Sequence, residues 1–144
     1  MPSGATTGRA TLANAFVAGF IAVLVFYQGA ATIVHLAGLS PNVPFPFSPT
    51  RPFGVPLIWS WAFWGGVWGI VYSFATQPFP RGLYYWGAAF LFGAIAPGLV
   101  LWFVVLPLRG APIAGGWRPL ALMTTPLIHG AWGVGTGLLL RWRP

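Results

Sequence analysis

The stretch Leu83-YYWGAAFLFGAIAPGLVLWFVVLP-Leu108 contains no charged residue and decides the fold class. About 20 apolar residues in a helix are enough to cross the hydrocarbon core of a bilayer, and this stretch is longer. Three more uncharged stretches, residues 13–39, 55–75 and 120–140, lie on either side of it. We therefore expect an all-α fold: one integral membrane domain over residues 1–144, built as a bundle of four transmembrane helices.

The composition supports a membrane location. Hydrophobic residues make up 57% of the chain and charged residues only 5%, whereas soluble domains have about 25% charged residues. The chain has seven basic residues, all Arg, and no Asp, Glu or Cys. Because the Arg residues are spread singly along the chain, they do not form the basic patch that nucleic-acid binding requires.

The Arg residues all lie outside the four apolar stretches, as the cost of placing a charge in lipid requires. Four helices put both termini on one side of the membrane, together with Arg9, Arg81, Arg141 and Arg143. The other side then receives Arg51, Arg109 and Arg118. This small excess favours cytoplasmic termini in a bacterial inner membrane.

The loop between the first two stretches, Ser40-PNVPFPFSPTRPFGVP-Leu57, is rich in Pro. Since Pro excludes helix and removes backbone donors, we expect an extended, rigid loop that lies on the bundle or in the headgroup layer. A lid or a docking surface for a partner is the alternative.

A weak internal repeat suggests that the chain consists of two helical hairpins in tandem. Arg51-Pro52 recurs as Arg118-Pro119, and Pro56-Leu-Ile recurs as Pro126-Leu-Ile. Trp64-Gly65 would then be equivalent to Trp132-Gly133. Such a pattern is typical of a parallel repeat.

Small residues mark the helix faces that approach one another or a partner. Gly65 and Gly69 fall on one face of the second helix, and Gly133 and Gly137 on one face of the fourth. Small residues at this spacing allow close packing of membrane helices, so we assign these four glycines to helix packing.

Polar residues inside the apolar stretches should face the bundle interior, because an unsatisfied polar group in lipid is costly. Gln28, Thr32 and His35 line one side of the first helix, and His129 and Thr136 lie on the fourth. The two imidazoles either make interhelical hydrogen bonds or bind a haem or other tetrapyrrole as a cofactor. A shared haem is disfavoured, because the two histidines are expected at different depths.

These residues do not predict an enzyme. Without a carboxylate there is no acid to orient a Ser–His pair, and two histidines alone make a poor metal site. We therefore predict no catalytic residue, no metal and no resident cofactor. The favoured function is a non-catalytic subunit or assembly factor of a membrane complex, with anionic lipid, another membrane subunit or a second copy as its partners.

Two alternatives stay open at this point. One is a small transporter or channel for an anion or another solute, lined by the polar residues of the first and fourth helices. The other is a membrane protein that holds a haem or pigment through His35 or His129. The absence of a carboxylate argues against cation-coupled transport.

The motifs Arg51-PFGVP-Leu57, Phe63-WGGVWG-Ile70 and Ile128-HGAWGVGT-Gly137 resemble those of a group of small four-helix bacterial membrane proteins. The resemblance covers most of the chain. It implies the four-span topology and the bacterial cytoplasmic membrane, and it implies no activity and no catalytic residue. Small multidrug carriers are similar in size, but their first-helix Glu is missing here.

Overall fold

The structure is a computed structural model that describes residues 4–141 and places side chains from residue 12 onward. Over these residues the fold is all-helical, with four helical rods and no β-strand. The first rod combines α1 (Gly4–Ala22), η1 (Val23–Tyr27) and α2 (Gln28–Leu36), and the second is α3 (Leu57–Ala75). The third combines α4 (Leu83–Val100), η2 (Leu101–Val105) and α5 (Leu106–Leu108), and the fourth is α6 (Pro119–Arg141).

Two of the four rods are long and apolar enough to cross a membrane: Leu12–Leu36 and Leu83–Leu108. Helices α3 and α6, with 19 and 23 residues, are not among these candidate spans, and Gly, Trp, Ser and Thr are interspersed with their aliphatic residues. The helices otherwise follow the apolar stretches of the sequence, except that α1 begins at Gly4 and its rod ends at Leu36.

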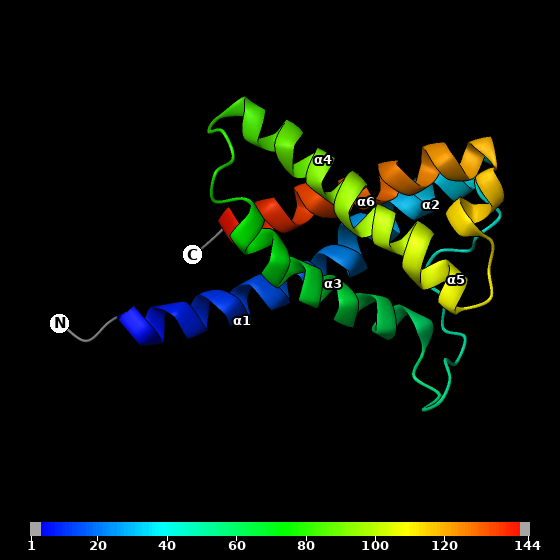
Figure 1. The fold of residues 1–144 in the computed structure, drawn as a ribbon, viewed down its shortest axis with the longest axis horizontal. Helices are drawn as coiled ribbons and strands as arrows, with labels where there is room; N and C mark the ends of the chain where they lie inside the picture. The colour runs from blue at the N-terminus through cyan, green and yellow to red at the C-terminus, as the bar shows by residue number, and fades with distance from the viewer. Residues whose placement is uncertain (1–3, 142–144) are drawn as a thin grey trace.

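The rods run back and forth along one axis. Figure 1 shows the start of α1, the end of α6 and the α3–α4 loop at one end of the molecule, and the other two loops at the opposite end. Arg81 and Arg141 thus lie at the end where α1 begins and α6 ends. Arg51, Arg109 and Arg118 belong to the opposite end. The side chains of Arg9 and Arg143 are outside the described part.

The Pro-rich loop caps α3 with backbone carbonyls. No side chain caps this helix at Pro56; instead, the N–H of Leu57 donates to the carbonyl of Ser48, and that of Ile58 to the carbonyl of Pro46. These bonds satisfy two of the donors that a helix start leaves unpaired. The loop is therefore fixed against the end of α3. The loop before α6, at the same end of the molecule, contains η3 (Ile113–Trp117).

Two hairpins with the same packing make up the fold. In the first, α1 packs along α3, and in the second, α4 packs along α6. A Cβ added to Gly69 would meet the Ala15 carbonyl and Gly19 Cα. A Cβ added to Gly133 would meet the Ala89 carbonyl and Gly93 Cα in the same way. Likewise, Gly66 and Gly130 lie against the rings of Phe16 and Phe90.

These contacts define the register of the repeat. Ala15-FVAGFI-Ala22 is equivalent to Ala89-FLFGAI-Ala96, and Trp68-Gly69 is equivalent to Trp132-Gly133. The pairing of Trp64-Gly65 with Trp132-Gly133 that the sequence suggested is therefore wrong by one helical turn. It arose because Trp-Gly occurs twice in α3, and only the packing partner distinguishes the two copies.

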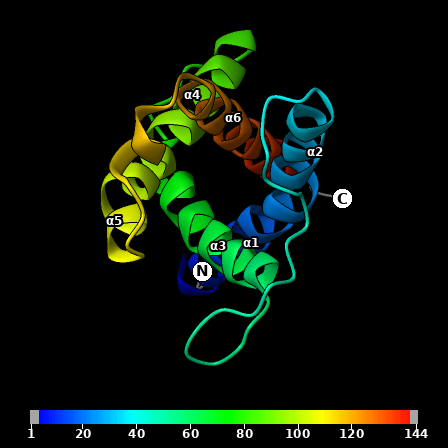
Figure 2. The same ribbon diagram turned by 90° about the vertical axis from the view of Figure 1, so that its right-hand side faces the viewer.

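The two hairpins meet on one side only. Helix α6 contacts α1, and the buried indole N–H of Trp132 donates to the carbonyl of Gly19 at 3.0 Å. The equivalent contact would join α3 to α4, but among the described residues these helices have no comparable interface. They meet near their connecting loop, where the hydroxyls of Tyr72 and Tyr85 are 2.9 Å apart. Figure 2 shows the rods spread apart at the opposite end.

One substitution between the repeats accompanies this broken symmetry. Ala18 of α1, which is buried, corresponds to Phe92 of α4. The Phe92 ring stands edge-on to Tyr72 of α3, with ring centroids 5.5 Å apart. The smaller side chain thus stands in the hairpin helix that contacts α6, and the phenyl ring in the helix that has no comparable interface with α3.

Candidate functional site

Gln28 is fully buried and connects the first rod to the Pro-rich loop. Its side-chain oxygen Oε1 accepts the backbone N–H of Phe45 at 2.8 Å, seventeen residues further along the chain. Its Nε2 is buried without a hydrogen-bond partner. Phe45 has a positive φ of 52°, which few non-glycine residues adopt. Gln28 therefore holds the loop in a backbone conformation that requires support.

We expect Gln28→Leu to loosen this loop. The Phe45 N–H would lose its acceptor, at a cost of about 1–3 kcal/mol for an unpaired donor. Hydrogen exchange at Phe45 should accelerate at least tenfold, while the Gly54 amide, which bonds within the loop to the Thr50 carbonyl, should exchange as before. Thr32→Val is the control, because the Thr32 hydroxyl bonds only to its own helix. Unchanged exchange at Phe45 in Gln28→Leu would contradict the clamp.

The threonines of the predicted polar interior bond to their own helices. Thr32 Oγ1 donates to the Gln28 carbonyl at 2.7 Å, and Thr136 Oγ1 donates to the Trp132 carbonyl at 2.9 Å. Thr136 is fully buried and Thr32 is half-buried. Hydroxyls in this arrangement are satisfied by the preceding turn of helix. They are thus not connected to each other by hydrogen bonds.

His129 is half-buried on α6 and packs in an aromatic cluster. Its Nδ1 lies 2.9 Å from the Thr125 carbonyl, one turn earlier, so Nδ1 carries the proton that this bond needs. Its ring meets Tyr27 of η1 edge-on at 5.1 Å, and Tyr27 in turn meets Trp61 of α3. The imidazole therefore fills space between three rods, with Nε2 as its remaining acceptor.

His35 lies at the end of α2 and bonds in a similar way, with Nδ1 2.9 Å from the Ser40 carbonyl. The two histidines are at different depths. His129 packs on Tyr27, and His35 follows Tyr27 by eight residues, which is about 12 Å along a helix. Because two axial ligands of one haem must reach the same iron, this pair does not suit a bis-His haem.

The four glycines assigned to helix packing lie in contacts within the chain. Gly65 and Gly69 face α1, Gly133 faces α4, and Gly137 faces the hydroxyl groups of Tyr72 and Tyr85. The sequence pattern found these positions, but it could not reveal which helix covers each of them. These four positions are therefore covered within the chain and are not available to a second protein.

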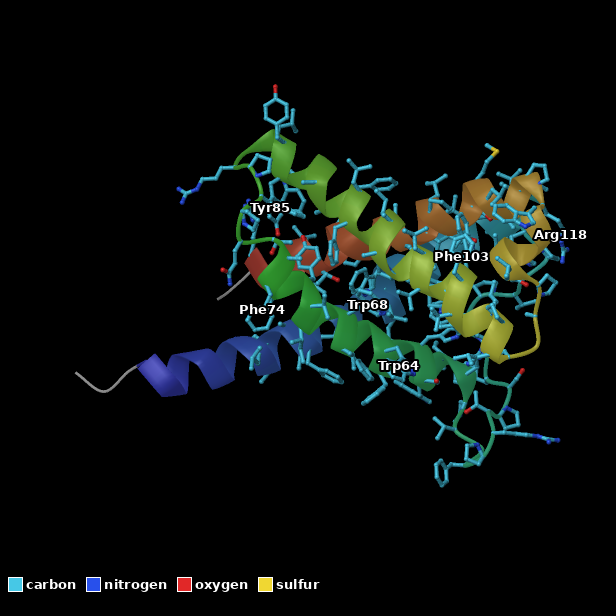
Figure 3. All side chains as sticks on the ribbon, viewed as in Figure 1. Trp64, Trp68, Phe74, Tyr85, Phe103 and Arg118 are labelled. Atoms are coloured by element: carbon cyan, nitrogen blue, oxygen red, sulfur yellow. The ribbon has the colours of Figure 1, made fainter. Side chains whose placement is uncertain are left out.

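The surface of the first hairpin carries an aromatic face that is formed by two helices. Its members are Trp59, Phe63 and Trp64 of α3 with Phe16 and Phe20 of α1. Phe63 is 50% exposed and Trp64 57% exposed. Trp64 and the half-buried Trp68 are marked on α3 in Figure 3, with Arg118 at one end of the molecule and Tyr85 toward the other.

The second hairpin lacks aromatic residues at the α3 positions of this face, although Phe16 of α1 corresponds to Phe90 of α4. Phe63 corresponds to Leu127, which is 52% exposed, and Trp64 corresponds to Ile128. Trp59 corresponds to Met123. The two hairpins thus share their internal packing but differ in the surface that they present.

The comparisons with known proteins add no relative. No protein-family model, no curated protein and no solved structure matches this chain. What can be said of its class therefore comes from its own residues: an all-helical protein in which two rods are apolar and long enough to cross a membrane.

Proposed function

We propose that this chain is a non-catalytic subunit or assembly factor of a membrane protein complex, with four spans in the bacterial cytoplasmic membrane. In this proposal α3 and α6 cross the bilayer beside the two more apolar rods, and both termini lie in the cytoplasm. The Gly and Trp residues of α3 and α6 suit this placement, because several of them pack against other rods.

The aromatic face is the observation that carries the proposal. Trp in membrane proteins is enriched at the headgroup level, whereas Phe63 and Trp64 lie well inside α3. Rigid aromatic side chains are also enriched at the centres of protein interfaces. Contact with lipid tails does not require aromatic rings, since the second hairpin exposes Met123 and Leu127 at the equivalent positions. The difference between the hairpins supports a protein partner at the first one.

The local hydrogen bonds of the interior also favour this function over transport. Thr32, His35, His129 and Thr136 each bond to a nearby backbone carbonyl. A conduction path would need polar groups that are directed into a shared channel. Transport and pigment binding therefore remain hypotheses without a supporting contact.

Photo-crosslinking tests the proposal. A photoreactive phenylalanine analogue at Phe63 should give a crosslink to a different membrane protein in native membranes. The same analogue at Leu127 is the matched control, because the position is equivalent and similarly exposed. The adduct at 63 should exceed that at 127 at least tenfold and should disappear in Trp64→Ala. Equal adducts at both sites, or adducts to lipid alone, would contradict a partner at the aromatic face.

A further inference from the structure

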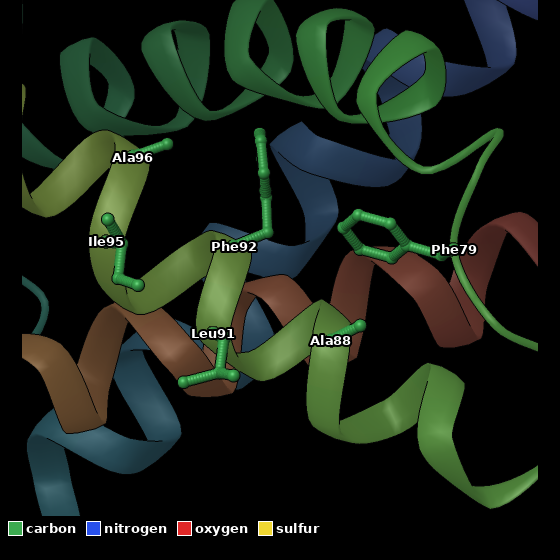
Figure 4. Close-up of a pocket in the computed structure, with 6 residues that line it drawn as sticks. All are labelled: Phe79, Ala88, Leu91, Phe92, Ile95 and Ala96. Atoms are coloured by element: carbon green, nitrogen blue, oxygen red, sulfur yellow. The ribbon is translucent and has the colours of Figure 1, made fainter.

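An open apolar groove runs along α4 and includes Phe92, the residue at which the symmetry of the repeat is broken. Its volume is about 320 Å³, and its lining is Phe79, Ala88, Leu91, Phe92, Ile95 and Ala96. Figure 4 shows Phe92 pointing from α4 toward α3, with Phe79 approaching from the connecting loop. From Ala88 to Ala96 the groove follows α4 for about 12 Å. A slot of this shape and chemistry suits a hydrocarbon chain.

Cationic groups lie at one end of this groove. Arg81 is exposed in the α3–α4 loop, two residues after the groove residue Phe79. The guanidinium of Arg141 lies 3.7 Å from the ring centroid of Tyr85, and the Tyr85 ring is 6.3 Å from that of Phe79. Contacts therefore run from Arg141 through Tyr85 to the groove. The other end of the groove, at Ile95 and Ala96, lies deeper along α4.

These arginines need an anion that the chain does not supply. The chain has no Asp or Glu, so no side-chain carboxylate can neutralise them. The cation–π contact directs the Arg141 guanidinium over Tyr85 and, at 5.6 Å, over Trp86. Aromatic rings of this kind favour the headgroup level of a bilayer. A phosphate group at that level would meet both the positive charge and the entrance to the groove.

We infer that this end of the molecule is a binding site for one anionic phospholipid. The phosphate lies between Arg81 and Arg141, and one acyl chain occupies the groove along α4. The inference rests on the membrane placement in the proposed function, but not on the protein partner at the aromatic face. The groove is the place where the second hairpin interface is missing, so a bound chain fills space that a helix contact fills on the other side.

Native mass spectrometry tests the site. The purified protein is mixed with equal amounts of phosphatidylglycerol and phosphatidylcholine that carry the same acyl chains. We expect one phosphatidylglycerol per chain to be retained in preference to phosphatidylcholine. Arg81→Gln with Arg141→Gln should weaken this retention about tenfold or more, because each basic residue near the headgroups contributes to binding anionic lipid.

Two controls separate the site from general attraction between opposite charges. Arg109→Gln with Arg118→Gln removes the same charge from the opposite end and should leave retention unchanged. Ala96→Leu narrows the groove and should reduce retention, whereas Ala94→Leu, on the same helix but not in the groove lining, should not. Thermal midpoints of all variants establish that they are folded.

The outcomes are distinct. Equal loss in both Arg pairs, or equal retention of both lipids by the unaltered protein, would overturn the site. So would full retention in folded Ala96→Leu. Resistance of the protein to carbonate extraction from membranes tests the membrane placement separately, and the crosslink at Phe63 tests the partner separately. A failure of the lipid site is therefore distinguishable from a failure of the proposed function.

Discussion

Gly69→Ala and Gly133→Ala should each destabilise the protein strongly, and to a similar extent. At these positions helix backbones are in direct contact: an added Cβ would lie 3.0 Å from Gly19 Cα in one hairpin and 3.1 Å from Gly93 Cα in the other. It would also meet the carbonyl of Ala15 or Ala89. Because backbone cannot move aside as a side-chain tip can, the whole helix pair must separate. We expect a loss of about 2 kcal/mol or more, near the upper part of the range for overpacking.

The measurement is the thermal midpoint in detergent, which should fall by about 10 °C. Gly29→Ala and Gly87→Ala are matched controls, because these glycines are also helical but have nothing within 4 Å of an added Cβ. Both controls should be neutral or stabilising, by up to about 1 kcal/mol, as Ala is the better helix former. The packing assigned to the repeat would be wrong if the two pairs behaved alike.

The helices could be predicted from the sequence because their signal is local. Uncharged stretches of sufficient length fix where a helix can lie, and the structure has helices at Leu57–Ala75 and Leu83–Leu108 where they were expected. The prediction was less accurate at the ends of the first rod, which was expected over residues 13–39. Residues 4–12 are helical, but they are not apolar enough to be recognised as part of a membrane span. At the other end, Gly38 has a φ of 74°, and the helix ends before it.

The contacts between helices could not be predicted in the same way. The face of small residues in α3 was recognisable, but Gly19 and Ala15, which cover it, stand in α1 among many similar residues. The bond from Trp132 to Gly19 joins residues more than a hundred positions apart. The sequence repeat also could not show that Phe92 is equivalent to Ala18. That equivalence follows only from the register of the two hairpins, which their glycine contacts define.

The burial of Gln28 followed from its position in an apolar stretch, but its partner did not. A buried amide must find a hydrogen-bond partner, and the sequence alone names none for Gln28. The structure instead uses a backbone N–H of the Pro-rich loop. Pro residues remove several backbone donors from this loop. The N–H of Phe45 is one of the donors that remain, and it connects the loop to Gln28.

Trp132→Ala should be at least as damaging as the glycine substitutions, because Trp132 joins the two hairpins. The side chain is 3% exposed, its indole donates to the Gly19 carbonyl, and its ring meets Tyr72 edge-on at 6.3 Å. It thus contacts α1 and α3 from α6. Truncation of a buried Trp costs about 3–5 kcal/mol. We expect a thermal midpoint at least 10 °C below that of the unaltered protein.

Substitution of Trp68, the equivalent residue of the first hairpin, separates the contribution of the bond between the hairpins from the loss of a large side chain. Trp68 corresponds to Trp132 but is only half-buried, and it makes no matching bond to the Gly93 carbonyl among the described residues. Trp132→Phe, which removes the N–H donor, should cost about 1 kcal/mol more than Trp68→Phe. Equal losses would mean that the hydrogen bond does not hold the hairpins together. The packing of α1 against α6 would then have to account for the closed side of the bundle, and Ala18→Phe should open it by placing a ring where Phe92 stands in the other repeat.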